Sequence, residues 1–379
     1  MKLAICHPFL YVRGGAERVV LKIAQHFDAK IYCALYDKDK TFPEFQDCDI
    51  EVMQTKLFRY LPKHLPIRVR HAVAAGRIFY GKKLDDYDVV NAQGTPSEWI
   101  RHHNSPVIWY CHTPNRESYD LYNWRMRQRN LPNKALYWFN IQAYRLLENM
   151  TVPKIEHVFA NSRNTQNRLK KYLNVESEVL NPGVDYNDFE CNSYDKFFFY
   201  PSRITPEKRF EYVIRAFKEF KKKKPEFKEW QLVIAGSLFA DRQDHAAYYE
   251  HIKRMLDGHG RILVDVPFTE LRDLYSKAYS VLYSPINEDF GIVPLEALAS
   301  SKPVISVNEG GPKEVIENGK TGFLVNSPKE MAEKMAFLAE RPEKAEEMGK
   351  LGRKNVEKNF SWKQFLKRFE GVCKKIEKK

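Results

Sequence analysis

Residues 284–311 read SPINEDFGIVPLEALASSKPVISVNEGG, and this stretch decides the fold class of the chain. It follows an apolar run at residues 280–283 that is typical of a buried strand. Within it, apolar residues recur at helical spacing, and a second apolar run at 303–307 leads to Gly310 and Gly311. This order of strand, loop, helix, strand and glycine turn predicts an α/β protein with a parallel sheet.

Two carboxylates accompany the predicted helix: Glu288 lies before it and Glu296 lies within it. A helix that begins near Phe290 directs free backbone N–H groups and a positive dipole end toward an anion, commonly a phosphate. Because carboxylates repel phosphate, both glutamates are expected to face hydroxyl groups, such as those of a nucleotide sugar. Two glutamates at this spacing are by themselves more typical of ordinary surface residues. The hypothesis of a nucleotide-sugar site therefore depends on the strand, turn and helix that surround them.

Residues 288–325, EDFGIVPLEALASSKPVISVNEGGPKEVIENGKTGFLV, resemble the donor-binding segment of the retaining glycosyltransferases of family 4. That family has two Rossmann-like domains facing a cleft, the GT-B type, so the resemblance implies the same α/β fold here. It implies that Glu288 contacts hydroxyls of the donor sugar and that Glu296 contacts the ribose. The donor-binding residues that it implies between them are Asp289, Phe290, Gly291, Ile292 and Val293.

The chain has 379 residues, enough for two domains of ordinary size, and is 43% hydrophobic and 29% charged, as globular proteins are. It contains no run of 18 apolar residues that would predict a spanning helix. The opening residues, MKLAICHPFLYVRGGAE, predict a strand and a glycine loop rather than a signal peptide. We therefore expect a cytoplasmic protein, with peripheral attachment to the cytosolic membrane face left open.

Six cysteines are scattered along the chain without a CxxC pair: Cys6, Cys33, Cys48, Cys111, Cys191 and Cys373. Several lie in or beside apolar runs, which predicts buried free thiols in a reducing compartment. The sequence predicts no metal site and no cofactor other than a nucleotide-sugar donor substrate.

The formal net charge of +13 is compatible with nucleic acid, an anionic membrane or phosphorylated substrates. Residues 55–84 and 124–150 interleave Lys and Arg with aromatic and aliphatic residues. Such segments can lie at a membrane interface, or they can pack their apolar faces onto the domain, and both options stay open. No nucleic-acid-binding motif accompanies them, so nucleic acid is not an expected partner.

In the first half of the chain, residues 2–6 predict a strand, and Gly14 and Gly15 precede a helix predicted over 17–27. Glycines there allow close approach of backbone to a ligand, although a plain turn fits equally well. A further strand at 107–110 leads to His112, in the segment YCHTP. The family resemblance implies that the glycine loop faces the donor diphosphate and that His112 is the active-site histidine. Asn115, which follows the HTP of residues 112–114, departs from the family pattern, so the resemblance does not say which residues contact the acceptor.

The segment VLNPGVD at 179–185 resembles the family's interdomain linker. We expect an acceptor-side domain over 1–182, a nucleotide-sugar-binding domain over 183–359, and a C-terminal helix over 360–379 that returns to the first domain. The second domain begins with a strand at 197–200, after which Arg203 and Lys208 flank a Pro206 that fits a first helical turn. Two such cations could neutralise a diphosphate, and the resemblance implies that they do.

The resemblance to family 4 implies a retaining transferase in which Arg203, Lys208, Glu288 and His112 are catalytic, and the fixed cations predict that it needs no metal ion. The segments PEKRFEYVIRAF and YCHTPNRE resemble enzymes that use GDP-mannose, so mannose is the expected sugar. A glycan or polyprenyl-linked acceptor, and possible contact with an anionic membrane, are the expected partners. The alternatives are a family relative that uses UDP-sugars, a UDP-sugar epimerase, or a non-enzymatic protein that binds RNA or membranes. Oligomeric state stays open.

Overall fold

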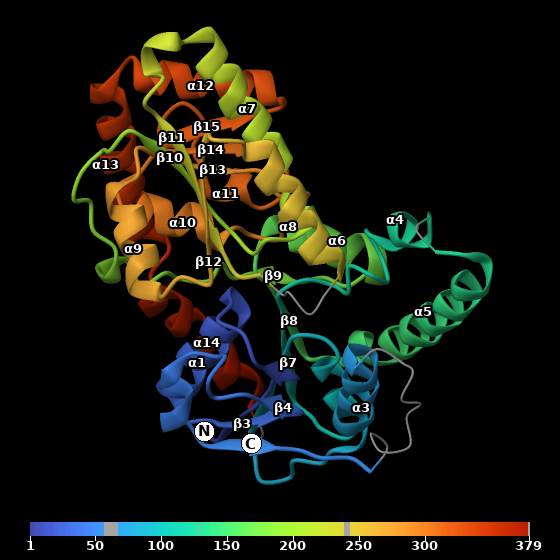
Figure 1. Ribbon diagram of the computed structural model, residues 1–379. Helices are drawn as coiled ribbons and strands as arrows, with labels where there is room; N and C mark the ends of the chain where they lie inside the picture. The colour runs from blue at the N-terminus through green and yellow to red at the C-terminus, as the bar shows by residue number, and fades with distance from the viewer. Residues whose placement is uncertain (57–66, 128, 239–242, 378–379) are drawn as a thin grey trace. The chain divides into compact units, whose positions relative to one another are not determined.

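A computed structural model describes residues 1–56, 67–127, 129–238 and 243–377 of the chain (Figure 1). The chain forms two compact units. Unit 1 comprises Met1–Pro182 together with Phe365–Lys379, and unit 2 comprises Gly183–Gln364. Each unit contains its own parallel sheet, so the predicted α/β class is confirmed.

The sheet of unit 1 has seven strands in the order β5-β3-β1-β6-β7-β8-β9, and every pair is parallel. Strand order reverses between β1 and β6, because the chain adds β3 and β5 on one side of β1 and the later strands on the other. The bounds are β1 Leu3–Cys6, β3 Lys30–Cys33, β5 Ile50–Val52, β6 Val89–Gln93, β7 Val107–Cys111, β8 His157–Ala160 and β9 Glu178–Val179. A separate pair joins β2 Phe9–Leu10 and β4 Leu35–Tyr36.

The helices of unit 1 are α1 Gly15–Phe27, α3 Ile67–Gly81, α4 Tyr122–Arg127, α5 Leu131–Thr151 and α6 Arg163–Leu173. Ser162 caps α6 by accepting a hydrogen bond from the Thr165 backbone N–H at 2.9 Å, which stabilises the first turn. The last helix, α14 Trp362–Ile376, contributes Phe365 and Phe369 to unit 1, where Phe365 packs edge-on against Tyr110.

The sheet of unit 2 has six parallel strands in the order β12-β11-β10-β13-β14-β15. Numbered by their order in the chain of unit 2, the strands run 3-2-1-4-5-6, the order of dinucleotide-binding Rossmann sheets. The strands are β10 Phe197–Pro201, β11 Gln231–Gly236, β12 Gly260–Val264, β13 Ser280–Tyr283, β14 Val304–Val307 and β15 Gly322–Val325. The helices are α7 Phe210–Lys223, α8 Gln243–Leu256, α9 Phe268–Lys277, α10 Ile292–Ala299, α11 Pro312–Val315, α12 Pro328–Ala339 and α13 Pro342–Asn359.

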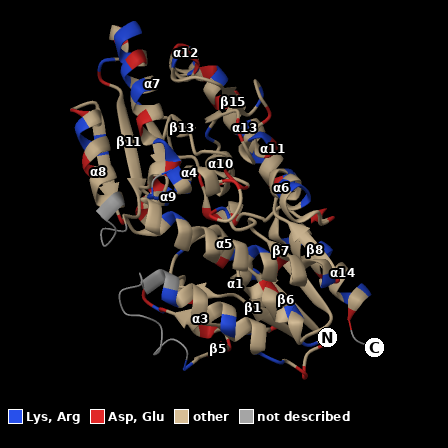
Figure 2. Ribbon diagram, turned by 90° about the vertical axis from the view of Figure 1, so that its right-hand side faces the viewer, with Lys and Arg blue, Asp and Glu red and all other residues tan. Residues whose placement is uncertain are grey.

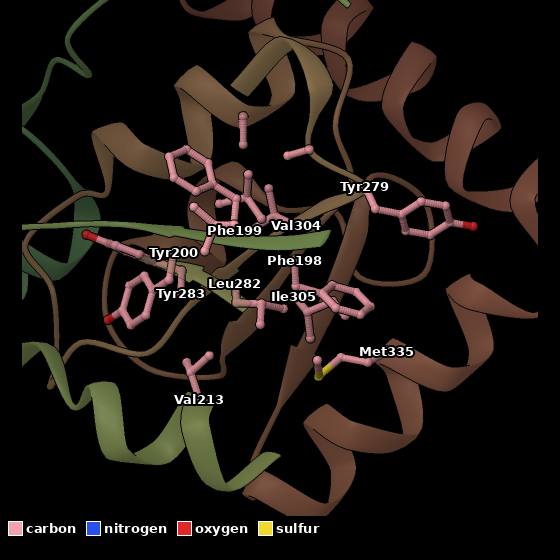
Figure 3. Packing of buried hydrophobic residues seen from close by; sticks show 14 of the residues in the cluster. Phe198, Phe199, Tyr200, Val213, Tyr279, Leu282, Tyr283, Val304, Ile305 and Met335 are labelled. Carbon is pink, nitrogen blue, oxygen red and sulfur yellow. The ribbon is translucent and has the colours of Figure 1, made fainter. Parts of the chain in front are cut away.

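Strand β10 shows why this sheet is covered on both faces. Its successive residues Phe198 and Phe199 are fully buried and point to opposite sides of the sheet (Figure 3). Phe198 contacts Phe220 of α7, and Phe199 contacts Tyr275 of α9. Parallel strands that are apolar on both faces require helices on both faces, and burial of each ring stabilises the fold by about 1.5–3 kcal/mol.

Several sequence predictions need a correction or fall outside the described residues. All six cysteines are free, but Cys48 is half-buried and Cys191 is exposed, so the prediction of buried thiols is wrong for these two residues. Residues 57–66, near the start of the first basic segment, lie outside the described residues. Excess cations lie partly in solvated places, such as the C-terminal end of α7, which is blue in Figure 2. No described helix is long and apolar enough to cross a membrane.

Candidate functional site

The reversal of strand order in unit 2 brings together the loops that follow β10 and β13. Open α/β sheets bind ligands at this point, outside the carboxyl ends of the strands. Lys208 closes a 3₁₀ turn, Pro206–Lys208, in the first loop, and Glu288 lies in the second. The Lys208 Nζ atom lies 2.6 Å from Glu288 Oε2, and the two side chains are 8% and 20% exposed. The structure therefore brings together two of the predicted site residues as a shielded ion pair.

Backbone contacts fix the two loops against each other. The Ile286 N–H donates to the Glu207 carbonyl at 2.9 Å, and the Ser284 hydroxyl donates to the Lys208 carbonyl at 3.1 Å. Arg209 donates to the carbonyls of Ser284 at 2.7 Å and Pro285 at 3.0 Å. Because these bonds hold the backbone on both sides of the ion pair, the loops that carry the two charged groups are fixed against each other before any ligand binds.

Arg209 also explains a correction to the sequence analysis. Its backbone is left-handed, with φ +52°, and it separates the 3₁₀ turn from α7, which begins at Phe210. Pro206 therefore opens a separate turn and does not lie in the first turn of α7. The sequence analysis did not single out Arg209, since nothing in a run of Lys and Arg distinguishes a cation that holds carbonyls from a solvated one.

Glycines shape the loop before α10. Gly291 adopts φ +107° directly before the helix, a conformation that side-chain-bearing residues rarely adopt. The Gly311 N–H donates to the Glu288 carbonyl at 2.8 Å, and a Cβ at Gly311 would lie 2.3 Å from the Phe290 Cα. The glycine turn after β14 thus allows close packing against the loop that carries Glu288.

The remaining donor residues predicted in unit 2 differ in exposure. Glu296 accepts a hydrogen bond from the Tyr275 hydroxyl at 2.7 Å, and burial together with the Glu296 charge raises the pKa of Tyr275 well above its usual range. Phe290 is 3% exposed and contacts Phe360, so its side chain is part of the core of unit 2. Arg203 is exposed. The half-buried residues are Asp289, Ile292 and Val293.

In unit 1, a chain of hydrogen bonds runs from the sheet to His112, at the end of β7. Asn91 Nδ2 donates to the Ile108 carbonyl at 3.2 Å, and Gln93 Nε2 donates to Asn91 Oδ1 at 2.7 Å. Gln93 Oε1 lies 3.0 Å from His112 Nε2. Because a carbonyl only accepts, the chain leaves Gln93 Oε1 as an acceptor, so His112 Nε2 must carry the proton. His112 Nδ1 is then the nitrogen with a lone pair.

The charge state of His112 follows from its surroundings. Burial, together with the positive charge of a protonated His7, lowers the pKa of His112 to about 3. The ring is therefore neutral at physiological pH, and it can accept a hydrogen bond at Nδ1 while Gln93 holds its Nε2–H. This arrangement suits a neutral polar contact and not a cationic one.

His7, at the end of β1, and Glu17 of α1 complete this cluster beside Gly14. His7 Nδ1 donates to the Gln93 carbonyl at 2.9 Å, and His7 Nε2 lies 3.6 Å from Glu17 Oε1. A Cβ at Gly14 would lie 2.5 Å from the Glu17 carboxylate, so Gly14 makes room for that side chain. Gly14 precedes α1, and Gly15 is its first residue and lies within the helix, which begins earlier than predicted.

The sequence analysis missed His7, Glu17 and Gln93. A signal for Gln93 was present: residues 89–93 read VVNAQ, and two amides in a strand buried on both faces require hydrogen-bond partners. Among the described residues, no group of three His, Cys, Asp or Glu side chains could hold a metal ion.

Two family models match consecutive parts of the chain, one to each half. The model described as Glycosyltransferase Family 4 matches residues 13–188, and the model described as Glycosyl transferases group 1 matches residues 187–355. The chain belongs to glycosyltransferase family 4. It is therefore a glycosyltransferase, as the sequence analysis predicted.

Similar curated proteins span this family 4 chain nearly end to end. The alpha-1,3/1,6-mannosyltransferase ALG2 of Dictyostelium discoideum is 26% identical over 99% of this chain and 98% of its own. The human protein of the same name is 26% identical over 98% of this chain and 95% of its own.

Solved structures agree on the fold of this glycosyltransferase. HepE of Anabaena in complex with UDP-glucose has a TM-score of 0.76 at 18% identity and covers 99% of this chain and 100% of its own. WaaG, a glycosyltransferase involved in lipopolysaccharide biosynthesis, has a TM-score of 0.70 at 13% identity and covers 99% of both chains. At such identities the likeness shows the fold alone, that of a GT-B glycosyltransferase with two Rossmann-like domains.

Proposed function

We propose that this glycosyltransferase is a retaining mannosyltransferase that takes mannose from GDP-mannose. The observation that carries the proposal is the ion pair of Lys208 and Glu288 at the point where strand order reverses in unit 2. One group of this pair can bind a diphosphate and the other can bind sugar hydroxyls. The similarity to ALG2 proteins, which carry the name of mannosyltransferases and match nearly the whole chain, supports mannose as the sugar.

The reaction breaks the bond between the anomeric carbon and a diphosphate oxygen, and the electron pair leaves with the nucleoside diphosphate. A hydroxyl oxygen of the acceptor forms the new bond to the same carbon, on the face that the diphosphate leaves, and its proton passes to an oxygen of the leaving diphosphate. The barrier is lowered by groups that stabilise the negative charge on the leaving diphosphate. Lys208, Arg203 and the N-terminal end of α10 supply positive charge without a metal ion.

The ion pair implies that Lys208 exchanges its partner, from Glu288 to the diphosphate, when the donor binds. Lys208 is already neutralised by Glu288 at 2.6 Å, so a diphosphate must compete for its ammonium group. As Lys208 turns to phosphate, Glu288 becomes available to accept hydrogen bonds from donor-sugar hydroxyls. Glu296, held by Tyr275, is the proposed partner of the ribose hydroxyls.

His112 has a different proposed role, because it is neutral. A hydrogen bond accepted at Nδ1 from a sugar hydroxyl would orient the ring of the sugar near the reacting carbon. Gly14 and Gly15, at the start of α1, are proposed to lie near the diphosphate through backbone N–H groups.

The acceptor is proposed to be a glycan, free or linked to a polyprenyl lipid, and the enzyme is proposed to work at the cytosolic face of a membrane. The basic and apolar surface of unit 1 supports this location. A bilayer-attached acceptor would then be reached without a spanning helix.

A panel of donors tests the proposal. GDP-mannose, GDP-fucose, UDP-glucose and UDP-N-acetylglucosamine are incubated with the enzyme, and released nucleoside diphosphate is measured with and without lipid-linked glycan. We expect release from GDP-mannose above the other donors. Release from a UDP-sugar alone would favour the alternative of a UDP-sugar transferase, and interconversion of UDP-sugars without release would favour an epimerase.

A further inference from the structure

Helix α5 of unit 1 is polar on the side that faces its own unit. Tyr137 donates to the Glu117 carbonyl at 2.6 Å, and the Tyr144 hydroxyl lies 3.1 Å from Glu148 Oε1 and 3.3 Å from Glu98 Oε1. Arg145 donates to the Ser118 carbonyl at 3.0 Å through Nε. With Ile141, which is 7% exposed, the inward positions recur three or four residues apart, and most of this face of the helix makes hydrogen bonds.

The opposite side of α5 is apolar and exposed. We call its six large side chains the outer face; with their exposed fractions they are Leu131 80%, Leu136 55%, Trp138 45%, Phe139 66%, Leu146 61% and Met150 48%. A surface helix ordinarily buries its apolar stripe and exposes its polar one, and α5 does the reverse.

This exposure is concentrated rather than scattered. Seven of the fourteen exposed large hydrophobic side chains among the described residues are the outer face and Trp124 of the neighbouring α4. Within unit 1, α5 stands out from the sheet (Figure 1), and its outer face is exposed. Contiguous apolar surface of this kind marks an interaction site, whereas single exposed apolar residues are normal.

The charges beside the outer face are mostly positive. Residues 122–151 contain five cations: Arg125, Arg127, Arg129, Lys134 and Arg145. Their single carboxylate, Glu148, is buried on the inward side, where burial raises its pKa to about 7. One neighbouring carboxylate, Glu117, pairs with Arg125 at 2.9 Å. The apolar stripe is therefore bordered by a net positive charge.

We propose that the outer face of α5, with Trp124 of α4, binds the surface of a bilayer that carries anionic headgroups. An amphipathic helix lies in the plane of an interface with its apolar side chains among the acyl chains and its cations at the headgroups. Tryptophan favours that depth, and Trp124 and Trp138 both lie on the exposed side. A second copy of the chain fits less well, because pairing two such faces would bring cations of the same sign together.

This inference does not rest on mannose or on GDP, since it concerns where the enzyme binds and not what it transfers. The test is co-sedimentation of the full chain with phosphatidylcholine vesicles, with and without phosphatidylglycerol. We expect the wild type to sediment with the anionic vesicles and more weakly with the neutral ones. The double substitution Phe139→Ser and Leu146→Ser should lower the partition coefficient about tenfold or more. Leu351→Ser, at an exposed leucine of α13 that is 41% exposed, is the matched control and should bind as the wild type does.

Two further variants separate insertion from a loss of folding. Trp124→Phe with Trp138→Phe should keep the far-UV circular dichroism of the wild type and should remove most of the blue shift of tryptophan emission on vesicle addition. Arg127→Glu with Lys134→Glu should abolish the preference for anionic vesicles while leaving the outer face intact.

Three results would overturn the proposal. The first is a wild type that does not sediment with anionic vesicles, and the second is a Phe139→Ser and Leu146→Ser variant that sediments as the wild type does. The third is a wild-type dimer, seen by sedimentation velocity without vesicles, that this double variant converts to monomer. In that last case the outer face would belong to a second copy of the chain.

Discussion

Replacing Lys208 by Met probes the ion pair of unit 2 directly. Methionine retains most of the apolar length of the side chain and removes its charge. The substitution takes away a charge-assisted hydrogen bond to phosphate, worth about 1.5–3 kcal/mol. It also leaves Glu288, which is 20% exposed, next to the diphosphate without the positive charge of Lys208. Two like charges about 4 Å apart repel by about 4 kcal/mol at an effective dielectric constant of about 20.

The first effect alone weakens GDP binding by about 10–150-fold, and the repulsion adds to that loss. Isothermal titration of GDP into the wild type and the Lys208→Met variant measures the change. Lys277→Met is the matched control: this lysine lies on α9 of the same unit and pairs with Asp273 at 2.8 Å. Its replacement should leave GDP affinity unchanged.

Glu288→Gln is expected to change GDP affinity in the opposite direction to Lys208→Met. The amide preserves shape but no longer neutralises Lys208, so GDP should bind as tightly as in the wild type or more tightly. Release of GDP from GDP-mannose should nevertheless fall at least tenfold, because the carboxylate for sugar hydroxyls is gone. If Lys208→Met binds GDP within about threefold of the wild type, the pair does not bind the diphosphate and the reasoning fails.

Three other outcomes follow from the same geometry. Gly311→Ala should weaken GDP binding more than tenfold by displacing the Glu288 loop, because its Cβ would meet backbone; unchanged affinity by titration would contradict this. His112→Ala should lower the rate of transfer, while GDP affinity stays within about threefold of the wild type. The pH–rate profile of the wild type should show no inflection from His112 above about pH 5, since the pKa of this residue is about 3. Burial raises the pKa of Glu98 and Glu148, so the folded state holds more protons than the unfolded state, and the free energy of unfolding of unit 1 should fall from about pH 5 to about pH 8. Glu98→Gln should reduce that fall in denaturant titrations. An unchanged dependence of the unfolding free energy on pH in this variant would contradict the reasoning.

The sequence predicted the layers of the fold where patterns are local. The apolar run at 280–283 is β13 with the same bounds, since a buried parallel strand is continuously apolar. It predicted less well where the backbone departs from a pattern. Arg209 breaks the expected helix after Pro206 through a left-handed conformation that serves contacts with the distant loop of Ser284.

The candidate sites divide in the same way. Lys208 and Glu288 could be singled out separately, but their direct contact depends on the parallel pairing of β10 with β13, which no local pattern encodes. His112 could be singled out, whereas its tautomer depends on Gln93 and Asn91 in another strand. The inverted polarity of α5 was not visible either, because the spacing of residues does not say which side of a helix faces the unit.

Thermal unfolding with GDP, UDP and ADP is the measurement that tests the central claim most directly. A ligand that binds only the folded protein raises its stability by an amount that grows with the logarithm of the ligand concentration above the dissociation constant. The account predicts a concentration-dependent rise in unfolding temperature with GDP, a smaller one or none with UDP and ADP, and its loss in Lys208→Met. A rise with UDP and none with GDP would contradict it.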